Sequence, residues 1–164
     1  KNKYTYILYV FHSTKEYHKN IQSYIEKSKL KNCESISDDK IKSYILKKSI
    51  FAITKSGTIS LEICNLKIPS IILYKINLIN YLIIKMLIKT KYVNIINIAA
   101  KEEIIPELLQ SKCNAKNIFY NVNNFLENPN KIKEQVSKTE IIVNKLRTKK
   151  PSSELASLSI HKML

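Results

Sequence analysis

The chain has 164 residues, of which 45% are hydrophobic and 25% are charged, and its formal net charge is +15. This balance excludes a disordered chain, and the length fits one domain near the usual size of about 100–150 residues. The charge favours an anionic partner, such as a nucleotide or a membrane surface. Direct nucleic-acid binding is not expected, because arginine, the residue suited to bidentate phosphate contacts, occurs only at Arg147.

The three cysteines, Cys33, Cys64 and Cys113, are widely spaced. Without a Cys-x-x-Cys pair or a histidine cluster, the pattern supports neither a metal site nor a disulfide framework. We therefore expect free thiols in a reducing cytoplasm, and no signal peptide is visible at this N-terminus. The sequence does not begin with Met, so a piece of a longer chain is one expectation.

The first predicted elements are a strand from Tyr4 to Phe11 and a helix from about Lys15 to Leu30. The strand is continuously apolar and rich in β-branched and aromatic residues, which indicates a buried, parallel strand. The helix is predicted to place four residues on its inward face: Tyr17, Ile21, Tyr24 and Ile25.

Short segments follow that alternate between strand and helix. They are a strand or loop at Cys33–Ser37, a helix from Asp38 or Asp39 to about Lys48 with Ile41, Ile45 and Leu46 inward, a strand at Ser49–Thr54, a helix at Thr58–Asn65 and a strand at Ser70–Tyr74. This alternation predicts an α/β fold with a doubly wound, Rossmann-like parallel sheet and helices on both faces. Ligands bind such sheets outside the carboxyl ends of the strands.

The only glycine of the chain, Gly57, lies at such a strand end, between Ser56 and Thr58. A strand, a glycine turn and the start of a helix present free backbone N–H groups at the positive end of a helix dipole, which suits a phosphate group. The alternative is an ordinary turn glycine, because Ser-Gly-Thr alone is an unspecific motif.

The most apolar stretch, Ile76–Ile88, is too short to span a membrane, which takes about 20 residues. Its flanking lysines leave two interpretations open: a helix buried against the sheet, or an interfacial helix whose lysines meet anionic headgroups. Further on, Pro106–Gln110 is predicted to start a helix. A helical tail is predicted at about Ala115–Glu127, Pro129–Leu146 and Pro151–Leu164.

Four motifs in the middle of the chain are specific when taken together and in order. They are Ser-Gly-Thr followed after two residues by Leu-Glu (Lys55–Glu62), a Pro with a hydrophobic strand that ends in Tyr-Lys (Ile68–Lys75), a Tyr-Val segment with Asn and Ala further on (Lys89–Glu102), and Pro-Glu-Leu-Leu-Gln (Ile105–Gln110). This series resembles the C-terminal half of the lipid-A-disaccharide synthases, bacterial glycosyltransferases of the GT-B type. The resemblance covers the whole chain loosely and Phe51–Asn117 well.

The resemblance implies transfer of a sugar from UDP-2,3-diacylglucosamine to 2,3-diacylglucosamine 1-phosphate, which gives lipid A disaccharide 1-phosphate and UDP. It implies an inverting enzyme that is peripheral to the cytoplasmic face of the inner membrane, with no metal and no cofactor. Residues 1–164 would form a single UDP-sugar (donor) binding domain. The acceptor domain with its general base would lie in an N-terminal half that has no counterpart here. The chain alone would then bind UDP-type ligands without completing the transfer, and a homodimer or a separate N-terminal half would be its protein partner.

The resemblance also assigns residues to the donor. The N–H groups of Gly57 and Thr58 and the hydroxyls of Ser56 and Thr58 would bind the diphosphate and stabilise the charge that develops on UDP. Glu62, one helical turn after Thr58 on the same face, would accept hydrogen bonds from the ribose. Asn97 would orient the donor sugar or its phosphate.

Three further residues are assigned near this site. Lys101 stands where the family has Arg and keeps the charge without the bidentate fork, while Tyr74 and Lys75 would line the same cleft. The chain departs from the family pattern at Ile96, where the family has Pro, and at Ala100, where it has Gly. The second departure costs turn freedom if the backbone φ there is positive.

Two other functions stay open from the sequence. One is another UDP-sugar glycosyltransferase of the same architecture. The other is a non-catalytic module that binds a membrane surface, which the net charge and Ile76–Ile88 would support.

Overall fold

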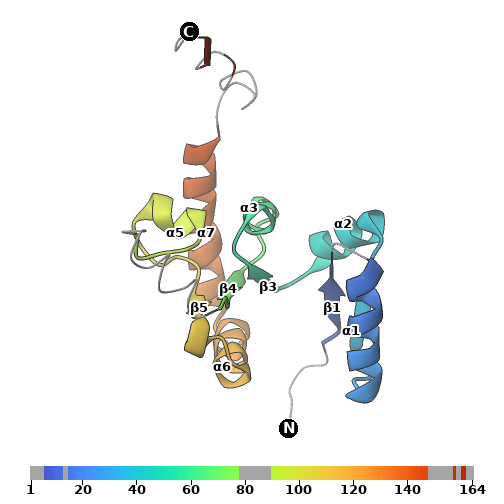
Figure 1. The fold of residues 1–164 in the computed structure, drawn as a ribbon. Helices are drawn as coiled ribbons and strands as arrows, with labels where there is room; N and C mark the ends of the chain where they lie inside the picture. Colours follow the sequence, from blue (N-terminus) through green and yellow to red (C-terminus); the bar gives the residue numbers. More distant parts are fainter. Residues whose placement is uncertain (1–5, 13–14, 78–89, 148–156, 158–159, 162–164) are drawn as a thin grey trace. The chain divides into compact units, whose positions relative to one another are not determined.

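The computed structural model describes residues 6–12, 15–77, 90–147, 157 and 160–161 (Figure 1). The chain divides into two compact units, Lys1–Ser49 and Ile50–Leu164. The prediction of one donor-binding domain across the whole chain stays a prediction.

The first unit pairs two parallel strands and adds two helices. Its elements are β1 (Leu8–Phe11), α1 (Lys15–Lys27), β2 (Cys33–Ile36) and α2 (Asp39–Lys48). The register of the strand pair runs from Leu8 opposite Cys33 to Phe11 opposite Ile36. Helix α2 begins where the sequence predicts, because the side chain of Asp38 accepts hydrogen bonds from the N–H groups of Lys40 and Ile41.

The apolar faces predicted for this unit are only partly buried. Ile25 and Leu46 are buried, but the side chains of Tyr17 and Tyr24 are 57% and 77% exposed, and Ile41 is exposed as well. Strand β1 is exposed to half-buried, not buried as predicted. The physical reason is that a sheet of two strands covers only a narrow stripe of each helix within this unit.

The second unit carries a three-stranded parallel sheet. Its elements are β3 (Ala52–Lys55), α3 (Thr58–Asn65), β4 (Ser70–Tyr74), α5 (Ile95–Ala100), β5 (Glu107–Leu109), the short 3-10 helix η1 (Gln110–Lys112), α6 (Ala115–Leu126) and α7 (Pro129–Leu146). The strand order is β3-β4-β5, and both pairings are parallel. The predicted alternation of strands and helices is confirmed here.

Buried clusters on the two faces of this sheet show the doubly wound arrangement. One cluster joins Cys64, Ile72, Ile96, Ile104, Ile105, Ile142 and Val143, and the other joins Ile71, Leu108 and Phe125. Neighbouring residues of a strand point to opposite faces, so Ile71 and Ile72 of β4 each enter a different cluster. Helices α3 and α5 therefore cover one face and α6 covers the other (Figure 1). Both faces carry helices, as the sequence predicts.

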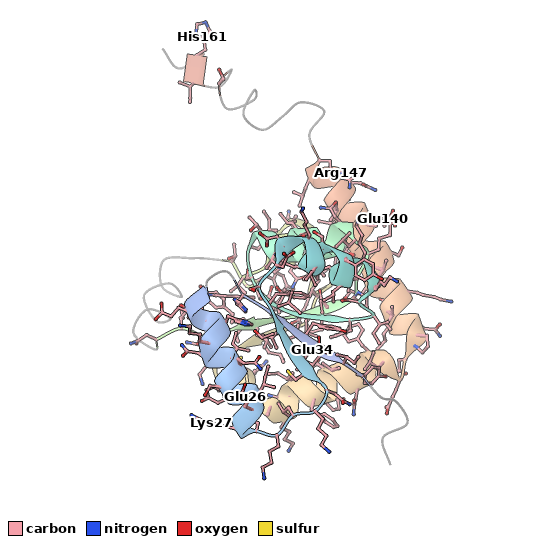
Figure 2. The ribbon with its side chains drawn as sticks, turned by 90° about the vertical axis from the view of Figure 1, so that its right-hand side faces the viewer. Glu26, Lys27, Glu34, Glu140, Arg147 and His161 are labelled. Carbon is pink, nitrogen blue, oxygen red and sulfur yellow. The ribbon has the colours of Figure 1, made fainter. Side chains whose placement is uncertain are left out.

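Helix α7 is tied to α3 at the surface. The guanidinium of Arg147 donates a hydrogen bond to Asn65 Oδ1 at 2.8 Å, and Lys67 Nζ lies 2.8 Å from a carboxylate oxygen of Glu140. Figure 2 labels Glu140 and Arg147 along α7. These contacts and the buried Ile142 and Val143 fix the C-terminal part of α7 over the same face of the sheet as α3, while Ile132 near its start packs against the cluster on the other face.

The prediction that Pro106–Gln110 starts a helix is wrong. Residues Glu107–Leu109 form β5, and Pro106 precedes it with its carbonyl bonded to the N–H of Ile72 at 2.9 Å. Proline has no backbone N–H, and it is tolerated at the start of a strand because no hydrogen-bond donor is required at that position. Burial of Leu108 against α6 and the parallel pairing with β4 override the local helix signal.

The remaining predictions for the second half divide by position. The helices predicted at about Ala115–Glu127 and Pro129–Leu146 are confirmed within one residue. Most of Ile76–Ile88 and of Pro151–Leu164 lies outside the described residues, although Ser157, Ile160 and His161 are helical. In the described part of the chain, every helix is too short or too polar to cross a bilayer.

Candidate functional site

The carboxyl ends of the three parallel strands define one edge of the sheet in the second unit. Lys55 is in register with Leu73, and Tyr74 is in register with Leu109, so the three strands end close together. The segments that follow them begin with Ser56, Lys75 and Gln110. This edge is where ligands bind in parallel α/β sheets.

Gly57 forms the turn at this edge in a conformation that only glycine adopts easily. Its φ is 142° and its ψ is −164°, and it is the N-cap of α3. No described atom lies within 4 Å of a Cβ built on Gly57, so the need for glycine comes from the backbone and not from crowding. The turn is therefore open on the side where a side chain would project.

The N-terminus of α3 offers donors to this open space. The first N–H groups of a helix have no partner within the helix, and no described side chain caps α3. Gly57 and Thr58 are both exposed. Together with the positive end of the helix dipole, these groups make a site suited to phosphate.

The hydroxyl groups of Ser56 and Ser60, on either side of Gly57 in the sequence, both donate hydrogen bonds within the protein. Ser56 Oγ donates a hydrogen bond to the carbonyl oxygen of Val93 at 2.8 Å, and the buried Ser60 Oγ donates to the carbonyl oxygen of Gly57 at 2.6 Å. A hydroxyl has one proton to donate. Donation from Ser56 to a diphosphate thus stays a prediction, and it requires the bond to Val93 to break.

Glu62 lies on α3 one helical turn after Thr58, and both side chains are exposed. The carboxylate of Glu62 makes no ion pair with another described residue. It is thus available to accept hydrogen bonds from a ligand bound at the start of α3.

The ends of β3 and β4 bring Tyr74 together with a residue that the sequence analysis missed. The ammonium group of Lys55 lies 5.9 Å from the centre of the Tyr74 ring, within the range of a cation–π contact. Lys75, the next residue after β4, is exposed. The position of Lys55 directly before Ser-Gly-Thr is the signal that could have identified it.

Asn97 is placed in the interior, not on the open edge. Its side chain is fully buried, and its amide donates to the carbonyl of Ile105 and to Glu107 Oε1 while its oxygen accepts from the N–H groups of Ile104 and Ile105. These four bonds use every hydrogen-bonding position of the amide. Asn97 therefore fixes the path of the chain from α5 into β5.

Lys101 follows α5 as its C-cap, with φ at 58°, and is exposed. Among the described residues, no hydrogen bond or ion pair joins Lys101 to the Gly57 turn, and it lies at the far end of α5 from the segment that Ser56 contacts. Ala100 is the last residue of α5, so the positive φ falls on Lys101 and replacement of glycine at position 100 carries no strain here.

Glu107, which is buried in β5, is not among the site residues predicted from the sequence. Its carboxylate accepts hydrogen bonds from the N–H groups of Val93 and Asn94 and from the amide of Asn97, each at 2.9 Å. A lone carboxylate within the apolar run Ile-Ile-Pro-Glu-Leu-Leu was the available signal, because buried charges require partners.

The cysteines differ in environment, and all three, each within the described residues, are free. Burial raises the pKa of the Cys64 thiol to about 11. Burial and, second, the charge of Glu34 raise the pKa of Cys33. These two thiols are thus protonated at neutral pH and poorly reactive.

Comparison with known proteins supplies the family. The sequence model described as lipid-A-disaccharide synthetase matches residues 1–160. The chain belongs to this family. Among its relatives, the lipid-A-disaccharide synthase of Rickettsia canadensis is 43% identical over 121 residues, which are 74% of this chain and 30% of the relative. The synthase of a Sulfurihydrogenibium species is 41% identical over 120 residues, which are 73% of this chain and 31% of the relative.

Membership of the lipid-A-disaccharide synthetase family confirms the resemblance drawn from the four motifs. The chain spans about 30% of the length of the curated relatives that it matches. In the structure, three of the motifs supply the turn after β3, the strand β4 and the strand β5. The remaining motif, which contains Tyr92 and Val93, supplies α5 and the segment before it. This segment contacts the Gly57 turn through the hydrogen bond from Ser56 to Val93.

Proposed function

We propose that this chain is the donor-binding part of a lipid-A-disaccharide synthase. The observation that carries the proposal is the open, uncapped start of α3 at Gly57, at the carboxyl edge of a parallel sheet, in a chain of this family. A diphosphate concentrates negative charge, and this position offers it unpaired N–H groups and a helix dipole. The relatives' name supplies the reaction class, transfer of a glycosyl group.

In the proposed reaction, a sugar passes from UDP-2,3-diacylglucosamine to 2,3-diacylglucosamine 1-phosphate with inversion, in a GT-B enzyme. The N–H groups of Gly57 and Thr58 and the Thr58 hydroxyl bind the diphosphate. Because negative charge grows on UDP as it leaves, the same donors stabilise the transition state. Glu62 accepts hydrogen bonds from the ribose, which the exposure of its carboxylate allows.

The other predicted residues take different places in this proposal. Tyr74, with Lys55 beside it, and Lys75 line the edge next to the diphosphate. Asn97 acts indirectly, since its four hydrogen bonds hold the segment between α5 and β5. Lys101 supplies positive charge at the end of α5. The general base belongs to a domain that binds the acceptor, so the isolated chain binds donor without turnover.

The test is titration calorimetry of UDP into the 164-residue chain, its Glu62→Ala variant and Glu127→Ala as a control. Glu127 is also an exposed glutamate, but it caps the end of α6. We expect saturable binding that Glu62→Ala weakens by about 1–3 kcal/mol, the cost of leaving polar partners unpaired, while Glu127→Ala binds as the wild type does.

Three results would count against the proposal. Absence of UDP binding to the wild-type chain would overturn the donor-binding function. Equal affinity in all three proteins would remove Glu62 from the site. Sugar transfer by the chain alone would show that the general base is present here. Competition between different UDP-sugars would then test which donor the site selects.

A further inference from the structure

Glu107 is buried behind the proposed diphosphate site, and its carboxylate is hydrogen-bonded to the segment that contacts the Gly57 turn. The residue is only 8% exposed, and its carboxylate accepts three hydrogen bonds at 2.9 Å, from the N–H groups of Val93 and Asn94 and from Asn97 Nδ2. An ionised carboxylate only accepts, so it matches three donors that point at one place. Strand β5 thereby fixes the backbone of the segment that leads into α5.

This segment is in turn bonded to the Gly57 turn along two routes. The carbonyl of Val93 accepts the hydrogen bond of Ser56 Oγ at 2.8 Å. The side chain of Asn94 donates to Ser60 Oγ at 2.9 Å, and Ser60 Oγ donates to the carbonyl of Gly57 at 2.6 Å. Thus the residue before Gly57 and the carbonyl of Gly57 itself are both held by the segment that Glu107 fixes.

The turn needs such support because glycine has more accessible backbone conformations than any other residue. Gly57 has φ of 142° and ψ of −164°, and no described side chain caps the helix that it starts. A glycine keeps one of these conformations only where its surroundings fix the backbone. Asn94 and Ser60 are fully buried, so their bonds are shielded from water and hold one arrangement.

We propose that Glu107 is a positioning residue that holds the Gly57 turn in the conformation that binds the diphosphate of a nucleotide. Glu107 touches no ligand and acts through Val93, Asn94 and Ser60. The inference rests on the proposed function, because it assigns the diphosphate to this turn. It adds that the affinity of the turn for phosphate is set from β5.

The central variant is Glu107→Gln, which keeps the size of the side chain but replaces one acceptor oxygen with an NH2 group. In either orientation, an N–H of Val93 or those of Asn94 and Asn97 then face a donor. The matched control is Gln135→Met, which removes another buried polar side chain of the same unit. Gln135 bonds to Ser70 and to the carbonyl of Ile104, at the opposite end of β4 from the Gly57 turn.

The first measurement is UDP affinity by calorimetry, beside urea unfolding for each variant. We expect both variants to lose stability, because each leaves buried groups unpaired. Only Glu107→Gln should weaken UDP binding, by about tenfold or more, which corresponds to about 1.4 kcal/mol or more. An equal loss of stability with unchanged affinity in Glu107→Gln would overturn the proposal and leave Glu107 a purely structural residue.

The second measurement needs no ligand and separates this proposal from the proposed function. Hydrogen exchange of the amides in Ser56–Ser60 should be faster in Glu107→Gln than in Gln135→Met. In Gln135→Met it is the amide of Ser70 that should exchange faster, because its N–H loses its acceptor, Gln135 Oε1. If the wild-type chain does not bind UDP, the proposed function fails, and exchange at this turn alone decides whether Glu107 positions it. Equal exchange in the two variants would overturn the positioning role.

A further variant covers the case in which Glu107→Gln does not fold. Ser60→Ala keeps all three hydrogen bonds of Glu107 but breaks the link from Asn94 to the carbonyl of Gly57. Weaker UDP binding with faster exchange at Gly57 would support the proposal. Affinity and exchange equal to those of the wild type would overturn it.

Discussion

At the scale of single residues, Gly57 shows how one backbone conformation can define a site. The turn lies outside the region that other residues adopt easily, while the space around it is open. The bulk of an added methyl group is thus accommodated, and its cost is conformational. A substitution at Gly57 therefore tests the cost of the backbone conformation alone, without a contribution from steric clashes.

Gly57→Ala should lower the free energy of unfolding by about 1–3 kcal/mol, the cost of a sparsely populated backbone conformation. It should also weaken UDP binding, because relief of the strain rotates the N–H groups at the start of α3. The measurement is urea unfolding and calorimetry of the variant. Ala100→Gly is the control, since position 100 is helical and glycine there should bring no gain in stability. A stabilised Ala100→Gly or an unchanged Gly57→Ala would contradict this account.

At the scale of elements, the start of α3 forms part of the candidate site, and the end of α3 packs in the core. Its start faces the open edge of the sheet, while Ile63 and Cys64 near its end are buried, Cys64 in the core cluster beneath α5 and α7. The helix is therefore positioned by packing at one end so that its other end can stay uncapped. Cys64 allows this packing to be tested by titration.

Burial raises the pKa of the Cys64 thiol from 9.0 to about 11, so folding favours the protonated form. The free energy of unfolding gained from this residue is complete below pH 9 and is lost as the pH rises through about 11, because the unfolded chain releases the proton first. At about 1.36 kcal/mol per pKa unit, the loss is at most about 2.7 kcal/mol.

The measurement for Cys64 is urea unfolding under reducing conditions across this pH window, for the wild type and for Cys64→Ala. The wild type should lose more stability with rising pH than the variant, since other titrating groups are common to both. Parallel pH profiles would contradict the buried position of the thiol. Thiol-specific reagents should also modify the half-buried Cys33 and Cys113 before Cys64.

At the scale of the whole chain, the net charge of +15 is the dominant feature outside the site. Such an excess of lysine attracts anionic surfaces and is screened by salt. We expect this charge to attract the chain to surfaces that carry anionic lipid.

Vesicles that contain anionic lipid should therefore bind the chain at low ionic strength and release it as salt is added, in a co-sedimentation assay. Neutral vesicles are the control and should bind weakly. Glu62→Ala should bind vesicles as the wild type does, because the donor site takes no part in this attraction. Binding that is insensitive to salt would exclude the electrostatic account.

Much of the fold could be predicted from local patterns. The apolar runs of β3 and β4 and the capping residue of α2 act over a few residues, so the sequence shows them directly. The exposure of Tyr17 and Tyr24 could not be predicted, because it depends on how few strands lie beneath α1 within its unit. The candidate site divides in the same way: Gly57 is visible as a turn residue, whereas Lys55 gains its place beside Tyr74 only from strand pairing.

The sequence by itself determined the alternation of strands and helices, the glycine turn after β3 and the family, because each rests on residues that are neighbours in the chain or motifs in fixed order. Only the tertiary structure decided that Glu107 lies in a strand, that Asn97 is buried and that Ser56 bonds to Val93. These features depend on partners brought together from distant segments, and buried polar groups find such partners only once the chain has folded.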